Sequence, residues 1–147
     1  MLQLAKAVPS LPATDFSPDL LRDGIERRKL SAPAVRLFVR LADLWGLDER
    51  QRLALLGDVS RATYYNWAKG AVGPLTRDQL ERVGLVLGVQ KALRTLFADD
   101  AAALRWLKGV NTDLPFSGRS PLDRMTLGSV DDLYAVRRYL DAWRGVK

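Results

Sequence analysis

Repeated helix-start signals are the sequence feature that most restricts how this 147-residue chain can fold. At three places, a short polar residue is followed three positions later by Gln or Asp, the spacing of a capping box at a helix N-terminus. No stretch of useful length alternates apolar and polar residues as a half-buried strand would. The chain is therefore predicted to be all-α, with seven to nine helices. The three pairs are Asp48 with Gln51, Thr76 with Gln79, and Ser129 with Asp132.

Apolar residues at helical spacing, punctuated by glycine and proline, indicate where the helices begin and end. Ser31-Ala32-Pro33 is expected to open a helix that ends at Gly46, because proline suits the first helical turn. Gly88 is expected to end another helix, with a shorter one following over 89–97. The other helices are expected at about 19–29, 48–56, 61–69 and 99–108, and a further helix is expected to begin at Ser120. The last helix is expected to follow the capping box at Ser129, with Leu133, Val136, Leu140 and Trp143 sharing one of its faces.

The chain contains neither cysteine nor histidine. This excludes disulfides, thiol nucleophiles, histidine general bases and metal sites built on either residue. The most obvious carboxylate clusters, Asp99-Asp100 and Asp131-Asp132, are adjacent residues that point about 100° apart on a helix. Helix capping already accounts for both pairs. We therefore expect a binding protein, with no enzymatic activity, no cofactor and no metal.

The net charge of +6 is concentrated in the middle of the chain. Residues 31–97 carry ten basic and six acidic side chains, a net charge of +4, whereas 1–30 and 98–147 each carry +1. A basic segment suits a polyanion such as nucleic acid, although a solvated basic surface would have the same composition. Neither a signal peptide nor a membrane span is expected, so the protein is predicted to be soluble and cytoplasmic.

Two short helices, 48–56 and 61–69, are separated by a four-residue turn, which is the spacing of a helix-turn-helix. Gly57 allows a positive φ in this turn and Ser60 caps the second helix. Trp67, with Thr63 or Tyr64, should face the core. Arginine suits guanine, asparagine suits adenine, and lysine suits phosphate. The predicted DNA-binding residues are Ser60, Arg61, Ala62, Tyr65, Asn66 and Lys69; the alternative is a helical hairpin that only packs.

A second motif lies near the C-terminus. Arg105-Trp106-Leu107 is followed by a loop that starts at Asn111, then by Gly118-Arg119-Ser120-Pro121-Leu122-Asp123. Ser120 and Pro121 suit a helix start, and Arg119 could pair with an acidic group or with a carbonyl. Together with the segment 60–70, this motif resembles the Xre/MbcA/ParS antitoxin family over about 33–147. In this chain, the residues that follow Asn111 and the segment 142–144 depart from the usual family pattern.

The resemblance implies a fold and a partner. It implies an Xre-like helix-turn-helix domain over 31–97 and a toxin-binding domain over 98–147, after a partly flexible N-terminal extension over 1–30. The implied partner is a RES-domain toxin that consumes NAD, by ADP-ribosyl transfer or by NAD degradation, and whose active site the C-terminal region blocks. The implied toxin-binding residues are Arg119, Tyr139, Trp143, Arg144, Gly145, Val146 and Lys147.

Two further expectations concern partners. Operator DNA is an expected ligand, and a homodimer is expected because helix-turn-helix proteins usually bind two half-sites. The apolar segment 80–97 is the predicted dimer surface. The alternative function is a stand-alone transcriptional regulator, in which 98–147 would serve for dimerisation.

Overall fold

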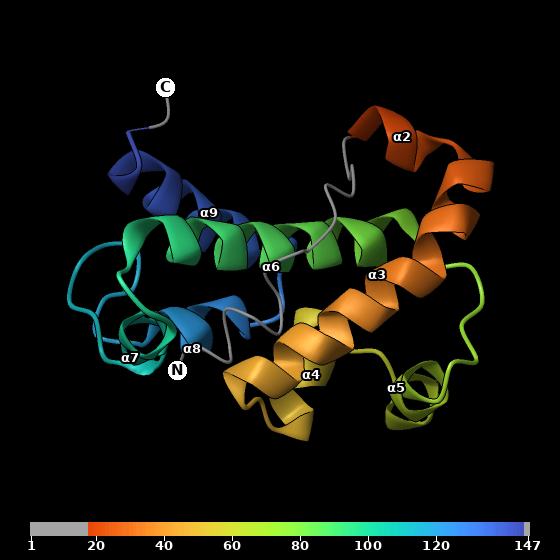
Figure 1. Ribbon diagram of the computed structural model, residues 1–147, viewed down its shortest axis with the longest axis horizontal. Helices are drawn as coiled ribbons and strands as arrows, with labels where there is room; N and C mark the ends of the chain where they lie inside the picture. The colour runs from red at the N-terminus through yellow and green to blue at the C-terminus, as the bar shows by residue number, and fades with distance from the viewer. Residues whose placement is uncertain (1–17, 146–147) are drawn as a thin grey trace.

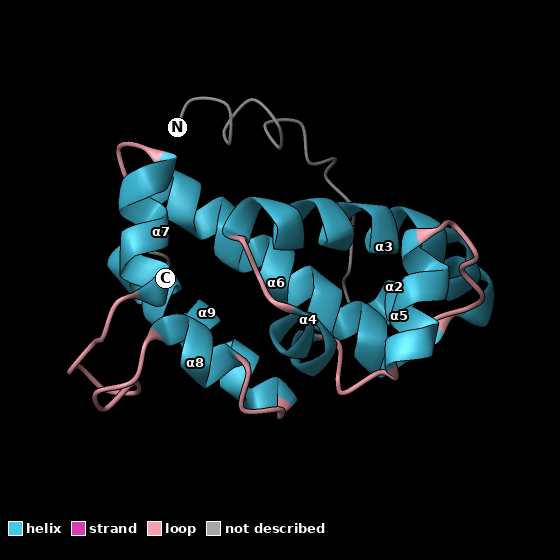
Figure 2. Ribbon diagram, turned by 90° about the horizontal axis from the view of Figure 1, so that it is seen from below, coloured by secondary structure: helices cyan, strands magenta, loops and turns pink. Residues whose placement is uncertain are grey.

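The computed structural model describes residues 18–145, which form eight helices and no strand (Figures 1 and 2). The prediction of an all-α fold is confirmed. The helices are α2 (Pro18–Arg22), α3 (Gly24–Trp45), α4 (Glu49–Leu55), α5 (Arg61–Ala68), α6 (Arg77–Leu96), α7 (Asp100–Lys108), α8 (Pro121–Met125) and α9 (Val130–Trp143).

Helix α6 is the centre of the fold. It packs most extensively against α9 and α3, and α2, α4 and α7 also contact it (Figure 1). Its side chains are buried from Leu80 near one end to Leu93 near the other. One continuous hydrophobic core therefore joins the helix-turn-helix region to the C-terminal helices.

Helix α3 runs unbroken through Pro33, where a helix start was expected. Its N-cap is Asp23, which accepts a hydrogen bond from the Ile25 N–H at 2.8 Å. Proline inside a helix removes one backbone hydrogen bond and costs about 3 kcal/mol. The α3 face beside this proline is packed into the fold, where the buried Ser31 donates to the Arg27 carbonyl at 2.6 Å and accepts from the Leu75 N–H at 2.9 Å. The helix also runs across residue 30, where a domain boundary was placed, and residues 1–17 of the extension lie outside the described residues.

Helix α6 likewise continues through Gly88, where the sequence predicted a helix end. The glycine has a packing role, because a Cβ atom at this position would lie 1.8 Å from Nη1 of Arg137 on α9. The missing side chain leaves room for the Arg137 guanidinium of α9 over this point of α6.

Because α6 is central, its apolar residues are not free for a dimer. Val83, Val86, Val89 and Leu93 are buried within the chain itself. The prediction that 80–97 forms the dimer surface is therefore wrong, whereas dimerisation itself stays a prediction. None of the described helices has the length and hydropathy needed to cross a membrane.

Candidate functional site

The helix-turn-helix is formed by α4 and α5. Ser60 caps α5 by accepting a hydrogen bond from the Thr63 N–H at 3.1 Å. Tyr64 and Trp67 are buried, and Tyr64 makes an edge-on ring contact with Phe38 of α3, with the centroids 6.4 Å apart. These contacts fix the rotation of α5 about its axis and so decide which face is exposed.

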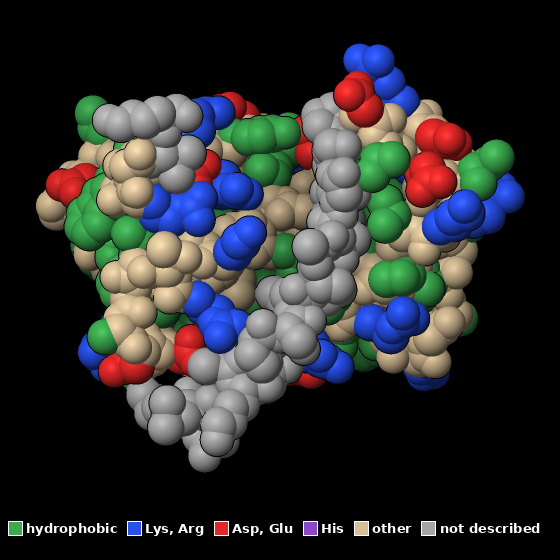
Figure 3. Space-filling view, turned by 45° about the horizontal axis from the view of Figure 1, so that its top comes forward, with side chains coloured by type: hydrophobic (Ala, Val, Ile, Leu, Met, Phe, Trp, Pro, Cys, Tyr) green, Lys and Arg blue, Asp and Glu red, His purple; other side chains and the backbone are tan. Residues whose placement is uncertain are grey.

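The six residues predicted to contact DNA lie together on the exposed face of α5 and at its two ends. Within the described part of the chain, the side chains of Asn66 and Lys69 make no hydrogen bond or ion pair, and both are exposed. They can therefore contact an external ligand without first breaking an internal bond. On the face seen in Figure 3, the basic side chains lie in several separate groups, so charge does not single out one region of this face.

Glu49 is a residue of this site that the sequence analysis missed. Its Oε1 atom accepts a hydrogen bond from the Tyr65 hydroxyl at 2.9 Å and pairs with Nε of Arg61 at 3.0 Å. The Arg61 guanidinium also lies 5.4 Å from the centre of the Tyr65 ring. The contact with Tyr65, followed by the charge of Glu49, raises the pKa of Arg61. No sequence signal distinguishes Glu49, because an acidic residue in the first turn of a helix is common.

The second site is the loop between α7 and α8. Its two ends are tied together, since the Asn111 N–H donates to the Arg119 carbonyl at 3.0 Å and the Gly118 N–H donates to the Asn111 carbonyl at 2.8 Å. Ser120 then caps α8 by accepting from the Asp123 N–H at 2.9 Å, as the sequence predicted. The motif is thus a closed loop that leads directly into a capped helix.

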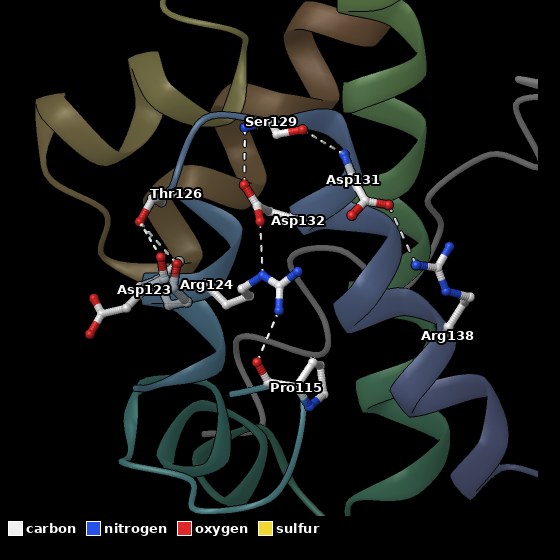
Figure 4. A network of polar contacts seen from close by, with 9 residues as sticks. Pro115, Asp123, Arg124, Thr126, Ser129, Asp131, Asp132 and Arg138 are labelled. Carbon is white, nitrogen blue, oxygen red and sulfur yellow. Dashed lines mark hydrogen bonds and ion pairs between the residues drawn. The ribbon is translucent and has the colours of Figure 1, made fainter. Parts of the chain in front are cut away.

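Arg124 holds this loop against the last helix, and the sequence analysis did not identify it. Its Nε atom pairs with Asp132 at 2.8 Å, and its Nη1 atom donates to the Pro115 carbonyl at 2.9 Å (Figure 4). The other carboxylate oxygen of Asp132 accepts from the Ser129 N–H at 3.1 Å and completes the capping box of α9. The same carboxylate therefore starts α9 and positions the loop.

A row of aromatic rings leads from the core to the surface beside this loop. Trp106 stacks on Tyr139, with the ring centres 5.9 Å apart and the planes 19° from parallel. Phe116 packs edge-on against both rings, and the ring of Trp143 packs beside that of Tyr139, with the ring centres 5.9 Å apart. The Tyr139 hydroxyl donates to Asp113 at 2.8 Å. Burial, followed by this hydrogen bond, raises the pKa of Tyr139.

Trp143 lies at the outer end of the row and is 60% exposed. Leu133, Val136 and Leu140, with which it was expected to share one face of the helix, are buried, whereas the Trp143 ring at the end of α9 continues the aromatic row toward solvent. Leu114 is 80% exposed and follows Asp113, the hydrogen-bond partner of Tyr139. Trp143 and Leu114 are thus two large exposed apolar side chains. Tyr139 contacts both of their segments, through the Trp143 ring and through Asp113.

The other predicted toxin-binding residues differ in their surroundings. Arg119 is exposed, and its side chain has no hydrogen bond or ion pair within the described residues. Arg144 is largely buried and pairs with Asp141 at 3.0 Å, so it is not a free cation. Gly145 has a positive φ of 71°. Val146 and Lys147 lie outside the described residues.

Comparison with known proteins assigns both regions. Residues 25–88 match the family model of the antitoxin Xre-like helix-turn-helix domain, and residues 92–145 match that of the antitoxin Xre/MbcA/ParS C-terminal toxin-binding domain. A relative, the uncharacterized protein y4oB of Sinorhizobium fredii (strain NBRC 101917 / NGR234), is 44% identical over 108 residues, which cover 74% of this chain and 81% of the relative. No solved structure matches the chain.

Proposed function

Because the chain belongs to the Xre/MbcA/ParS antitoxin family, we propose that it neutralises a RES-domain toxin that consumes NAD. Membership of this family makes it an antitoxin with a helix-turn-helix domain and a toxin-binding domain, and implies a regulatory rather than a catalytic protein. The proposal adds the class of toxin and the way in which it is inhibited.

The exposed ring of Trp143 is the observation that carries the proposed mode of inhibition. A tryptophan that is 60% exposed leaves a large apolar surface in water, which a partner protein would bury. Its contact with Tyr139 limits its motion, so less conformational entropy is lost on binding. Leu114 and Arg119 belong to the adjoining loop and would widen the contact. In this proposal, the end of α9 and the segment 144–147 enter the active-site cleft of the toxin.

We further propose that the exposed face of α5 binds operator DNA and that the protein represses its own promoter. Arg61, Asn66 and Lys69 supply the donors that base edges and phosphates accept. The capped N-terminus of α5 adds favourable backbone N–H groups toward a phosphate.

Co-expression tests the antitoxin proposal. A cognate RES-domain toxin would be expressed alone, with the full chain, and with a chain that lacks 143–147, while growth and cellular NAD are measured. We expect the full chain to restore both and to co-purify with the toxin, whereas the truncated chain should do neither. Killing that persists with the full chain, together with DNA binding in the absence of toxin, would instead favour a stand-alone regulator.

A further inference from the structure

The strongest feature that the proposed function leaves unexplained is the position of Glu49 beside the DNA-facing residues of α5. One oxygen atom, Oε1, holds both the Tyr65 hydroxyl at 2.9 Å and Nε of Arg61 at 3.0 Å. The two partners also contact each other, with the guanidinium 5.4 Å from the ring centre. The three side chains therefore form one closed cluster, which joins the first residue of α4 to two residues of α5, Arg61 and Tyr65, that lie one helical turn apart.

This cluster divides the exposed face of α5 into two unlike halves. In the C-terminal half, Asn66 and Lys69 make no side-chain bond within the described residues and carry a net positive charge. In the N-terminal half, the charge of Arg61 is neutralised by a carboxylate that is itself 42% exposed. A DNA phosphate that approaches Arg61 therefore meets a negative charge beside it.

We propose that Glu49 is a specificity-determining residue of the DNA-binding face, which suppresses binding to unselected duplexes. Phosphate contacts supply most of the affinity for random sequence. Glu49 weakens them by repelling phosphate and by occupying Arg61. A selected sequence compensates for this repulsion at its base edges, where guanine accepts from Arg61 and the cytosine amino group donates to a carboxylate. This inference rests on the proposed DNA binding.

The strength of the cluster suits such a role. All three side chains are partly exposed, and ion pairs of this kind are weak and screened by salt. DNA can therefore displace Arg61 from Glu49 when a better acceptor is offered. A buried pair would instead hold Arg61 permanently.

The test compares Glu49→Gln with Glu26→Gln. Both variants remove one negative charge, but Glu26 lies on α3 and pairs with Lys29, away from the cluster. Binding of the full-length protein to a random-sequence duplex, and to the DNA upstream of its own gene, would be measured by fluorescence anisotropy between about 50 and 200 mM salt. For Glu49→Gln we expect about tenfold tighter binding to the random duplex, and a log–log salt slope steeper by about 1. The gain on the upstream DNA should be smaller, and Glu26→Gln should match the wild type.

A second variant, Glu49→Ala, removes the acceptor for Tyr65 as well as the charge. Thermal melting checks that each variant is folded. Tightening in both Glu49 variants supports the proposal, because the charge is what they have in common. Unchanged or weaker binding in both overturns it.

The results also separate this inference from the proposed DNA binding. If the wild type binds DNA and Glu49→Gln behaves as Glu26→Gln does, this inference is wrong and DNA binding stands. If only the Glu49 variants bind DNA, the result supports the proposal that Glu49 suppresses DNA binding. If no variant binds either duplex, both proposals fail.

Discussion

The guanidinium of Arg82 lies against Gly57, so closely that a Cβ atom on the glycine would come within 3.0 Å of Nε. Arg82 belongs to α6 and is 8% exposed, and it pairs with Asp78 at 2.8 Å. It also donates to the Gly128 carbonyl at 3.1 Å, in the turn between α8 and α9. One side chain of the central helix thus packs under the helix-turn-helix turn and binds the turn that precedes the last helix.

Gly57→Ala should therefore destabilise the protein. The φ of Gly57 is +83°, where a side chain costs about 1–2 kcal/mol, and the added methyl group would also displace Arg82. Urea denaturation should show a loss of at least about this size. Gly73→Ala is the matched control, because no atom lies within 4 Å of its Cβ position and its φ is ordinary. Equal stability of the two variants would contradict the packing described for Arg82.

Trp143→Ala should separate toxin binding from folding. Because the side chain is 60% exposed, its loss should change the melting temperature little. As a proposed anchor, it should contribute about 2 kcal/mol or more, so the variant should bind the toxin about 30-fold more weakly. The control is Ile25→Ala, which truncates a different exposed apolar side chain (64% exposed). For both variants, toxin neutralisation would be scored and the affinity for the toxin measured by calorimetry. Full neutralisation by Trp143→Ala would place the anchor elsewhere.

Lys69→Ala should weaken DNA binding and flatten its salt dependence. A lost phosphate contact lowers the log–log slope by about 1, because one fewer counterion is released. Lys29→Ala provides the comparison, since Lys29 is also an exposed cation and lies on α3. If Lys69→Ala and the wild type have the same salt slope, the C-terminal end of α5 does not contact a DNA phosphate.

Stability should fall at high pH. The hydrogen bond to Glu81, followed by burial, raises the pKa of Tyr134 above its ordinary value of 10.0, and the pKa of Tyr139 is also raised. Because the folded state holds these protons more tightly, their contribution is complete below about pH 10 and is lost as the pH rises through the folded-state values. Urea titrations at about pH 8 and about pH 10.5 should show the decrease. The double variant Tyr134→Phe, Tyr139→Phe should lose less stability over this interval; an equal loss would assign the effect to other groups.

Oligomeric state can be checked without a partner. A homodimer is expected from the two half-sites that helix-turn-helix proteins usually bind. Light scattering of the free protein at micromolar concentration should give twice the 16.4 kDa chain mass. A monomeric mass would show that any pairing depends on toxin or DNA.

The capped helix starts were predictable because capping is a local interaction. Ser60, Asp99 and Ser120 all cap the helices expected of them, since each side chain reaches an N–H only three residues ahead. The same holds for the three capping boxes, at Asp48, Thr76 and Ser129, all of which close as expected. Periodicity likewise placed Trp67 in the core and left Thr63 or Tyr64 as the second core-facing residue of α5; the structure buries Tyr64.

The sequence by itself determined the all-α class, the helix-turn-helix and the capped loop motif, because these follow from contacts within one or two helical turns. Only the tertiary structure decided that α3 continues through Pro33, that Gly88 accommodates Arg137, and that Glu49 holds Arg61. It also decided that Trp143 is exposed. Each of these outcomes depends on which distant residues the fold brings together, and periodicity along one helix carries no information about such partners.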